Sequence, residues 1–332
     1  MAEAPAVGVA RRTAMAGVLA AVVLPAAACG IRLEDDAPRV PLVPTRTPVP
    51  GEAEFVALTR DTAALAALAA TTPGDLAADL ATIHRRQHTV LRSTLLRRHV
   101  PAEELDAATE LRGDASTEPG PTSSASEPSG SADATPTPSP TPLSPRVRLT
   151  RAEAASAATS GAYAGVETDL RATVASLHAQ RYAAASLLRG QDPVVPRDAV
   201  AGPEVGELAG LTSAATYFLE VVSARSQGRQ RARSAATLAA LRELRSDQLA
   251  GGTLPDEAIG HPLPFEVTDA GDAARLAREV LTTLRASYGE HLERLVTDHG
   301  ADGSAAATRW LGTVEVEGHR WGAPLSPFPG LE

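Results

Sequence analysis

The apolar residues of this chain are mostly small and aliphatic. It has four Phe, four Tyr and two Trp among 332 residues, although 43% of the chain is hydrophobic. The core must therefore be built from Ala, Leu and Val. Ala and Leu are good helix formers, whereas β-sheets favour aromatic and β-branched residues. This composition favours closely packed helices over a β-sandwich, and no alternating pattern long enough for a sheet occurs.

Apolar residues recur at helical spacing along most of the chain after residue 51. We expect a helical pair in 52–112 that packs on a bundle, including a short helix that begins at Pro101 and ends near Arg112. A helical segment is expected in 147–204 and a four-helix bundle domain in 205–332. Thr150 and Glu153 match a capping box, which predicts a helix start at Thr150. The expected fold class is all-α, an antiparallel helix bundle.

Residues 113–146 consist mainly of Gly, Ser, Thr, Pro, Ala and acidic residues. Such a composition buries too little apolar surface to offset chain entropy, so we expect a disordered low-complexity linker. Two interpretations stay open: an O-glycosylated tract or a bare insertion between helices.

The N-terminus resembles a bacterial lipoprotein signal peptide. Arg11 and Arg12 precede an apolar stretch, which ends in Ala26-Ala27-Ala28-Cys29-Gly30. Cys29 is the only cysteine of the chain. The resemblance implies removal of residues 1–28, lipidation of Cys29, and a Pro-rich tether over 29–51. The protein would then be anchored by lipid to the cell membrane, on its extracytoplasmic face.

The signal-peptide pattern leaves some alternatives open. The stretch before Cys29 is shorter than the ~20 apolar residues of a spanning helix and contains Pro25, which argues against an uncleaved anchor. A cleaved, secreted protein is the other alternative, because Ala26 stands where a lipobox usually has leucine. Arg11 and Arg12 fit twin-arginine export and general secretion about equally well.

Charge argues against one class of partner. The net charge is −9, and removing residues 1–28 takes away two Arg and one Glu, which leaves −10. Nucleic-acid binding requires a positive surface, so we expect no nucleic-acid partner. The membrane is the one partner that the sequence indicates, and it would be reached through the N-terminal lipid.

Four short motifs follow one another in the last third of the chain. They are Tyr217-Phe218, His261-Pro262-Leu263-Pro264-Phe265, His319-Arg320-Trp321-Gly322 and Pro327-Phe328-Pro329-Gly330-Leu331. In this order they resemble an uncharacterised ferritin-like four-helix domain of actinobacterial lipoproteins. The resemblance covers about residues 205–332 and implies a ferritin-like bundle there.

The resemblance raises the question of metal. Ferritin-like di-iron sites use Glu-x-x-His motifs, and none occurs in this sequence. His84 and His88 lie four residues apart on a predicted helix and are weak candidates for a zinc site. The residues between them include no Glu, and no third ligand is evident. We therefore expect no metal and no other cofactor, and interpret the pair as a chance spacing beside an apolar stripe.

Other chemistry finds little support in the sequence. Glu315, Glu317 and His319 could form an acid–base group, but packing near a helix end is the simpler interpretation. No nucleophile elbow, P-loop or dinucleotide fingerprint occurs. We therefore predict a non-enzymatic binding or scaffolding module of the cell envelope, whose protein or small-molecule partner the sequence does not identify. The alternatives are a metal-binding ferritin-like oxidoreductase or metal store, and a small-ligand carrier.

Overall fold

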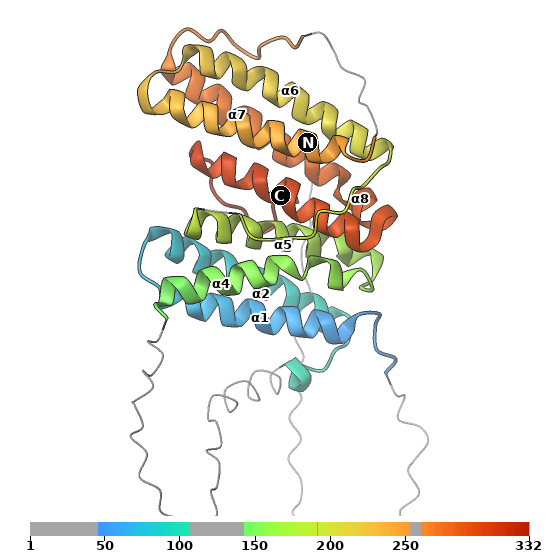
Figure 1. Cartoon of the computed structure of the whole chain (residues 1–332). Helices are drawn as coiled ribbons and strands as arrows, with labels where there is room; N and C mark the ends of the chain where they lie inside the picture. Colours follow the sequence, from blue (N-terminus) through green and yellow to red (C-terminus); the bar gives the residue numbers. More distant parts are fainter. Residues whose placement is uncertain (1–45, 106–142, 191, 253–259, 332) are drawn as a thin grey trace, which may run out of the picture. The chain divides into compact units, whose positions relative to one another are not determined.

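The chain folds into helices throughout the part that the structure describes. This structure is a computed structural model, and it describes residues 46–105, 143–190, 192–252 and 260–331. Its regular elements in chain order are α1 (Glu52–Ala70), α2 (Asp75–Arg97), α4 (Pro145–Ala158), the short 3-10 helix η1 (Ser160–Tyr163), α5 (Thr168–Arg189), α6 (Pro203–Arg225), α7 (Gly228–Leu249) and α8 (Ala270–Arg320) (Figure 1). No strand occurs among these residues, so the all-α prediction is confirmed.

The start of α4 corrects a detail of the sequence interpretation. The helix begins at Pro145, and the Ser144 side chain caps it by accepting from the Val147 backbone N–H. Thr150 is already inside the helix, where its hydroxyl donates to the Arg146 carbonyl oxygen at 2.8 Å. The capping box predicted at Thr150 and Glu153 is therefore wrong. A Ser followed by Pro at the first helical position is itself a helix-start signal.

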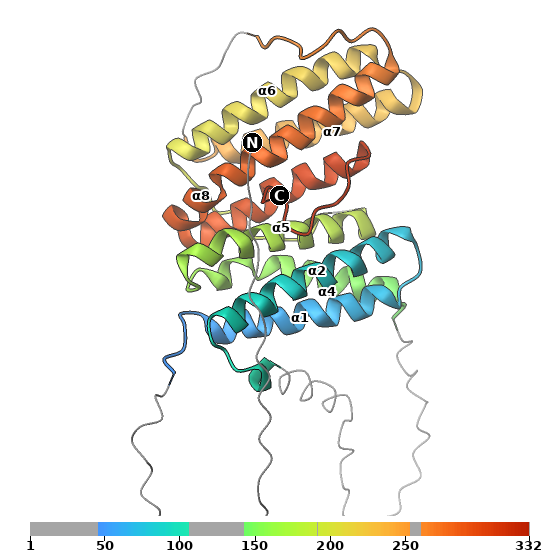
Figure 2. The same ribbon diagram turned by 180° about the vertical axis from the view of Figure 1, so that it is seen from behind.

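Helix α8 consists of two antiparallel halves. Gly300 has φ 54° and ψ −122°, which no helix can accommodate, so the chain turns there. Arg285 contacts Glu315, and Arg278 donates to the backbone oxygen of Trp321, so residues on either side of the turn face each other as in a hairpin. Figure 2 shows the two halves of α8 running beside each other. The four helices expected in 205–332 are thus α6, α7 and the two halves of α8.

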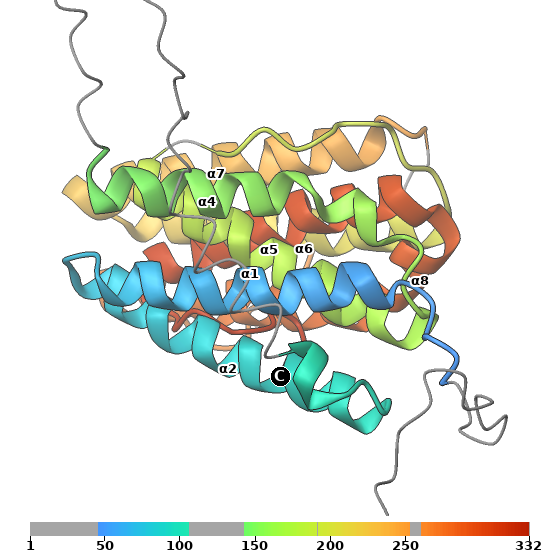
Figure 3. The ribbon, with the colours of Figure 1, turned by 90° about the horizontal axis from the view of Figure 1, so that it is seen from below.

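The helices form a stack of antiparallel pairs. Helices α1 and α2 pair with each other, and so do α4 and α5, while α6, α7 and the first half of α8 lie together at the other end (Figures 1 and 3). Helix α5 packs along α8 more extensively than any other two helices pack. The interior between them is mainly Leu, Ala and Val. Trp310 and Trp321 are 2% and 3% exposed, so both pack inside the bundle.

The segment after α8, residues 323–331, crosses several helices and is partly buried between them. Gln87 of α2 donates to the Pro327 oxygen at 2.6 Å, and Ser176 of α5 donates to the Pro329 oxygen at 2.7 Å. The backbone of Gly330 lies against Gly289, where a Cβ would come within 1.7 Å of the Gly330 oxygen. We call residues 323–331 the crossing segment.

Several sequence predictions fall on residues that the structure leaves undescribed. Arg11, Arg12 and Cys29 are among them, together with residues 29–45 of the tether and 113–142 of the predicted linker. Of the short helix expected after Pro101, residues 102–105 are helical and the remainder lies outside the described residues. Among the described helices, none combines the length and apolarity that crossing a bilayer requires.

Candidate functional site

The two histidines proposed from their spacing do not share a site. His84 is fully buried between the helices, and its Nε2 lies 2.6 Å from the Glu153 carboxylate of α4. His88 is only half-buried, and burial followed by the charge of Arg92 lowers its pKa. The four-residue spacing therefore places one imidazole in the core and the other at its edge.

A buried arginine completes the group around His84. The Arg181 guanidinium of α5 is fully buried and contacts the His84 ring through Nη1. Its Nη1 lies 3.6 Å from the Glu153 carboxylate, and its Nη2 donates to the Thr62 hydroxyl at 3.1 Å. Burial and then the Arg181 charge lower the pKa of His84, so this imidazole is neutral at pH 7. We call Thr62, His84, Glu153 and Arg181 the polar core.

The polar core does not fit a metal site. Only His84 and Glu153 in it are ligand types, whereas a ferritin-like di-iron centre needs several carboxylates as well as imidazoles. The Arg181 guanidinium contacts both His84 and Glu153, and it already supplies the positive charge that the buried Glu153 carboxylate needs. Within the described ranges, no group of three or more His, Cys, Asp or Glu side chains could hold a metal ion.

The acid–base candidates near the end of α8 point to different partners. Glu315 is buried and pairs with Arg285 at 2.9 Å, and it also accepts the Ser326 N–H at 2.6 Å. Glu317 is buried against α7, where it accepts from the Thr237 hydroxyl at 2.7 Å. The two carboxylates therefore fasten different parts of the fold and do not form one reactive group with His319.

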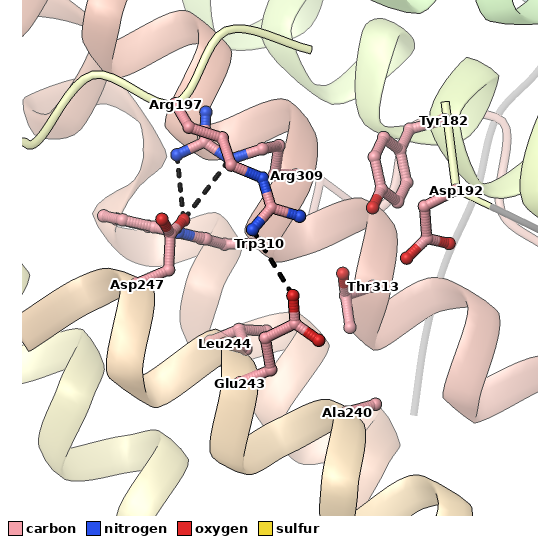
Figure 4. Close-up of a pocket in the computed structure, with 10 residues that line it drawn as sticks. All are labelled: Tyr182, Asp192, Arg197, Ala240, Glu243, Leu244, Asp247, Arg309, Trp310 and Thr313. Carbon is pink, nitrogen blue, oxygen red and sulfur yellow. Dashed lines mark hydrogen bonds and ion pairs between the residues drawn. The ribbon is translucent and has the colours of Figure 1, made fainter. Parts of the chain in front are cut away.

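A small pocket lies between α5, α7, the second half of α8 and the segment before α6 (Figure 4). Most of its charged side chains are already paired with one another. Asp247 accepts from Arg309 at 2.8 Å and from the Trp310 indole N–H at 2.6 Å, and Arg197 lies 3.3 Å from Glu243. The cavity of about 60 Å³ holds little more than water. This arrangement ties the segment before α6 to the bundle.

A larger open groove lies between α6 and the first half of α8. Its cavity volume is about 290 Å³. The wall is mostly apolar, with hydroxyl groups and one carboxylate along α8, and consists of Leu211, Ala214, Ala215, Phe218, Pro262, Pro264, Glu279, Val280, Thr283, Leu284 and Ser287. We call it the α6–α8 groove.

Two sequence motifs meet at this groove. The His261 ring lies 5.5 Å from the Tyr217 ring and 5.7 Å from the Phe218 ring, as measured between ring centroids. These aromatic contacts hold the segment with Pro262 and Pro264 against α6. Motifs that are more than forty residues apart in the sequence thus build one wall of the groove, and the sequence alone did not reveal this.

Sequence reasoning also missed Glu153 and Arg181. Both occupy positions on apolar stripes: Glu153 lies four residues after Leu149 and four before Ala157, and Arg181 lies four residues after Leu177. All three of these apolar residues are fully buried. A charged residue in the register of a buried stripe is the signal that could have identified the polar core.

The described fold defines an all-α helix-bundle protein with a self-paired polar core and an open apolar groove. Residues 209–332, which include most of α6, α7, α8 and the crossing segment, match the family model described as a domain of unknown function (DUF4439). This match agrees with the uncharacterised helical domain expected for the last third of the chain. No curated protein and no solved structure matches the chain.

Proposed function

We propose that this protein is a non-enzymatic binding module of the cell envelope, anchored by lipid on the extracytoplasmic face of the membrane. The α6–α8 groove is its binding surface. One observation carries this proposal: the buried charged groups of the bundle are paired with one another, whereas no described residue covers the apolar wall of the groove. An apolar concave surface with a few polar groups on its rim is the usual form of a binding site.

Photocrosslinking tests the groove directly. A photoreactive amino acid at Thr283 would line the groove, whereas the same group at Thr282 would not, although both residues are exposed on the same helix. We expect illumination of intact cells to give a discrete adduct from position 283 that is missing from position 282. The same adducts at both positions, or none at position 283, would contradict a binding role for the groove.

The anchor has its own test. Cys29→Ala removes the thiol that would accept the lipid, so we expect lipid labelling to be lost and the protein to leave the membrane fraction. Arg11 and Arg12 would direct export in this proposal. A Cys29→Ala chain that still fractionates with membranes in unprocessed form would show that the anchor assignment is wrong.

The alternative of a ferritin-like metal store or oxidoreductase lacks support from the polar core. Arg181 lies where a cation would have to sit beside Glu153 and His84. Metal analysis of the whole chain, purified without chelator, decides this point. Near-stoichiometric iron, manganese or zinc would favour the alternative, and we expect only trace amounts.

A further inference from the structure

The outer face of α2 combines positive charge with exposed apolar side chains. Residues 80–102 contain five arginines and no Asp or Glu, although the chain as a whole has a net charge of −9. Three of these arginines, Arg85, Arg86 and Arg97, are exposed. Residues three or four apart along a helix lie on one face, so α2 presents these arginines to solvent from one side.

The fold does not neutralise these three arginines. Arg85 and Arg97 donate to hydroxyl groups of their own helix, at 2.9–3.3 Å. Neither they nor Arg86 forms an ion pair with a carboxylate among the described residues. Arg98, farther round the helix, is the contrasting case, because it pairs with Asp169 at 2.6 Å. The positive charge of the outer face therefore remains available to an anionic partner.

Two large apolar side chains are exposed among the arginines. Val90 is 40% exposed and Leu96 is 38% exposed. An amphipathic helix that lies in a membrane interface has this composition, with arginine or lysine beside leucine and other apolar residues. We call the basic face the surface formed by Arg85, Arg86, Thr89, Val90, Leu96 and Arg97.

The basic face lies beside the point where the described chain begins. Helices α1 and α2 form one end of the stack (Figure 3). Phe55, near the start of α1, lines one cavity together with Thr94 and Arg97, near the end of α2. The residues that would carry the lipid, 29–45, therefore join the fold close to this face. Even when fully extended they reach at most about 60 Å, which limits how far the face can lie from the anchor.

We propose that the basic face of α2 lies against an anionic lipid surface. The arginine side chains contact lipid phosphates, and Val90 and Leu96 enter the boundary between headgroups and acyl chains. This contact goes beyond the lipid anchor of the proposed function and does not depend on it. A nucleic acid would pair with the same arginines but would give the two exposed apolar side chains no role.

A second group of exposed arginines provides a comparison. Arg225, Arg229 and Arg231 lie around the turn between α6 and α7, at the other end of the stack. No large apolar side chain is exposed among residues 221–242, all of which the structure describes. Charge alone would make the two groups equivalent, whereas the proposal assigns membrane contact to α2.

A fluorescent probe on the basic face tests the contact without any lipid on the protein. Cys29→Ser removes the only cysteine of the full-length chain, so Thr89→Cys supplies a single thiol for a polarity-sensitive fluorophore. Ala236→Cys, at an exposed position on α7, is the control. We expect a blue shift from position 89 with vesicles of equal parts phosphatidylglycerol and phosphatidylcholine, and none with phosphatidylcholine alone. Position 236 should respond to neither.

Two triple variants with the same change in net charge separate the arginine groups. The first removes the exposed arginines of the basic face: Arg85→Gln, Arg86→Gln and Arg97→Gln. The second removes those of the comparison group: Arg225→Gln, Arg229→Gln and Arg231→Gln. Each arginine near an anionic surface contributes about fivefold to binding, so the first variant should weaken the response at position 89 about a hundredfold in vesicle concentration. The second should change it less than about threefold.

The site-specific probe keeps the outcome interpretable. Residues 1–28 are common to all of these chains, and vesicle binding through them alone gives no blue shift at position 89. No response at position 89, an equal response to neutral vesicles, or equal weakening by the two triple variants would refute the proposal. A short DNA duplex that prevents the response at lower concentration than phosphatidylglycerol produces it would identify a nucleic-acid face instead. If a triple variant fails to fold, the two probe positions on the parent chain still decide.

Discussion

Replacing Arg181 with Met is the sharpest test of how the charges of the polar core stabilise the fold. Met keeps most of the volume but removes the charge that faces Glu153 and the donor to Thr62. Both partners are fully buried, so no water can take over these roles. Removing one member of a buried ion pair costs about 3–5 kcal/mol. At about 2–4 °C per kcal/mol for a chain of this size, the melting temperature should fall by about 10 °C.

The loss should depend on pH in a specific direction. In the parent chain burial, and then Arg181, lower the pKa of His84, while Glu153 opposes them. Without Arg181 the Glu153 carboxylate raises the pKa of His84 relative to the parent, so the folded variant takes up a proton more readily. The stability deficit of Arg181→Met should therefore shrink as the pH falls from about 7 to about 5.5, because protonated His84 then replaces the lost cation.

A paired replacement serves as the control. Glu153→Leu combined with Arg181→Met removes both charges, and replacing a whole buried ion pair by apolar residues is often neutral or stabilising by about 1–4 kcal/mol. We expect this double variant to recover most of the stability that Arg181→Met loses.

Urea denaturation at several pH values measures these effects through the midpoint, with the slope as a check on two-state behaviour. A deficit below about 1 kcal/mol for Arg181→Met, or one that does not change with pH, would refute the reasoning, because a surface pair would behave in that way.

Two further predictions concern the remaining buried groups. Burial lowers the pKa of His178 to about 3, so between pH 6.5 and 3 the unfolded chain binds more protons than the folded chain. The free energy of unfolding therefore falls as the pH drops below 6.5, by up to about 1.4 kcal/mol per pH unit. His178→Leu should make the free energy of unfolding, measured by urea denaturation at several pH values, depend less on pH. An unchanged pH dependence would contradict the assignment of this effect to His178. Gly289→Ala would place a Cβ 1.7 Å from the Gly330 oxygen. It should therefore lower the free energy of unfolding by about 1–3 kcal/mol, although Ala has the better helix propensity. It should also speed amide hydrogen exchange at Ser326. Gly165→Ala, whose Cβ would meet nothing within 4 Å, is its control, and equal effects of the two would contradict a tight contact.

The helices could be predicted from the sequence because their signals are local. The stripes with Leu80, Leu91 and Leu95 or with Leu276 and Leu284 repeat at helical spacing, and these residues are buried in the structure. The error at Thr150 arose where two local signals competed. Ser144 and Pro145 fall within the linker that composition predicts, so the weaker motif six residues later points to Thr150 as the helix start.

The sites could not be predicted because they depend on which helices become neighbours. Glu153 and His84 are 69 residues apart in the chain, and their contact follows from the packing of α2, α4 and α5. The α6–α8 groove likewise needs the segment at Pro262 to lie against Phe218. A single sequence does not show that α2, α4 and α5 are neighbours, or that the segment at Pro262 lies against α6.

The crossing segment links the region matched by the family model, residues 209–332, to helices that lie outside that region. Its residues fall inside the matched region, yet the Pro327 and Pro329 oxygens accept from Gln87 and Ser176, which lie outside it. A substitution at position 87 or 176 therefore leaves a buried or half-buried carbonyl oxygen unsatisfied in the other part. The two parts are not free to vary independently, and related chains should change positions 87 and 176 in concert with the Pro-rich residues after α8.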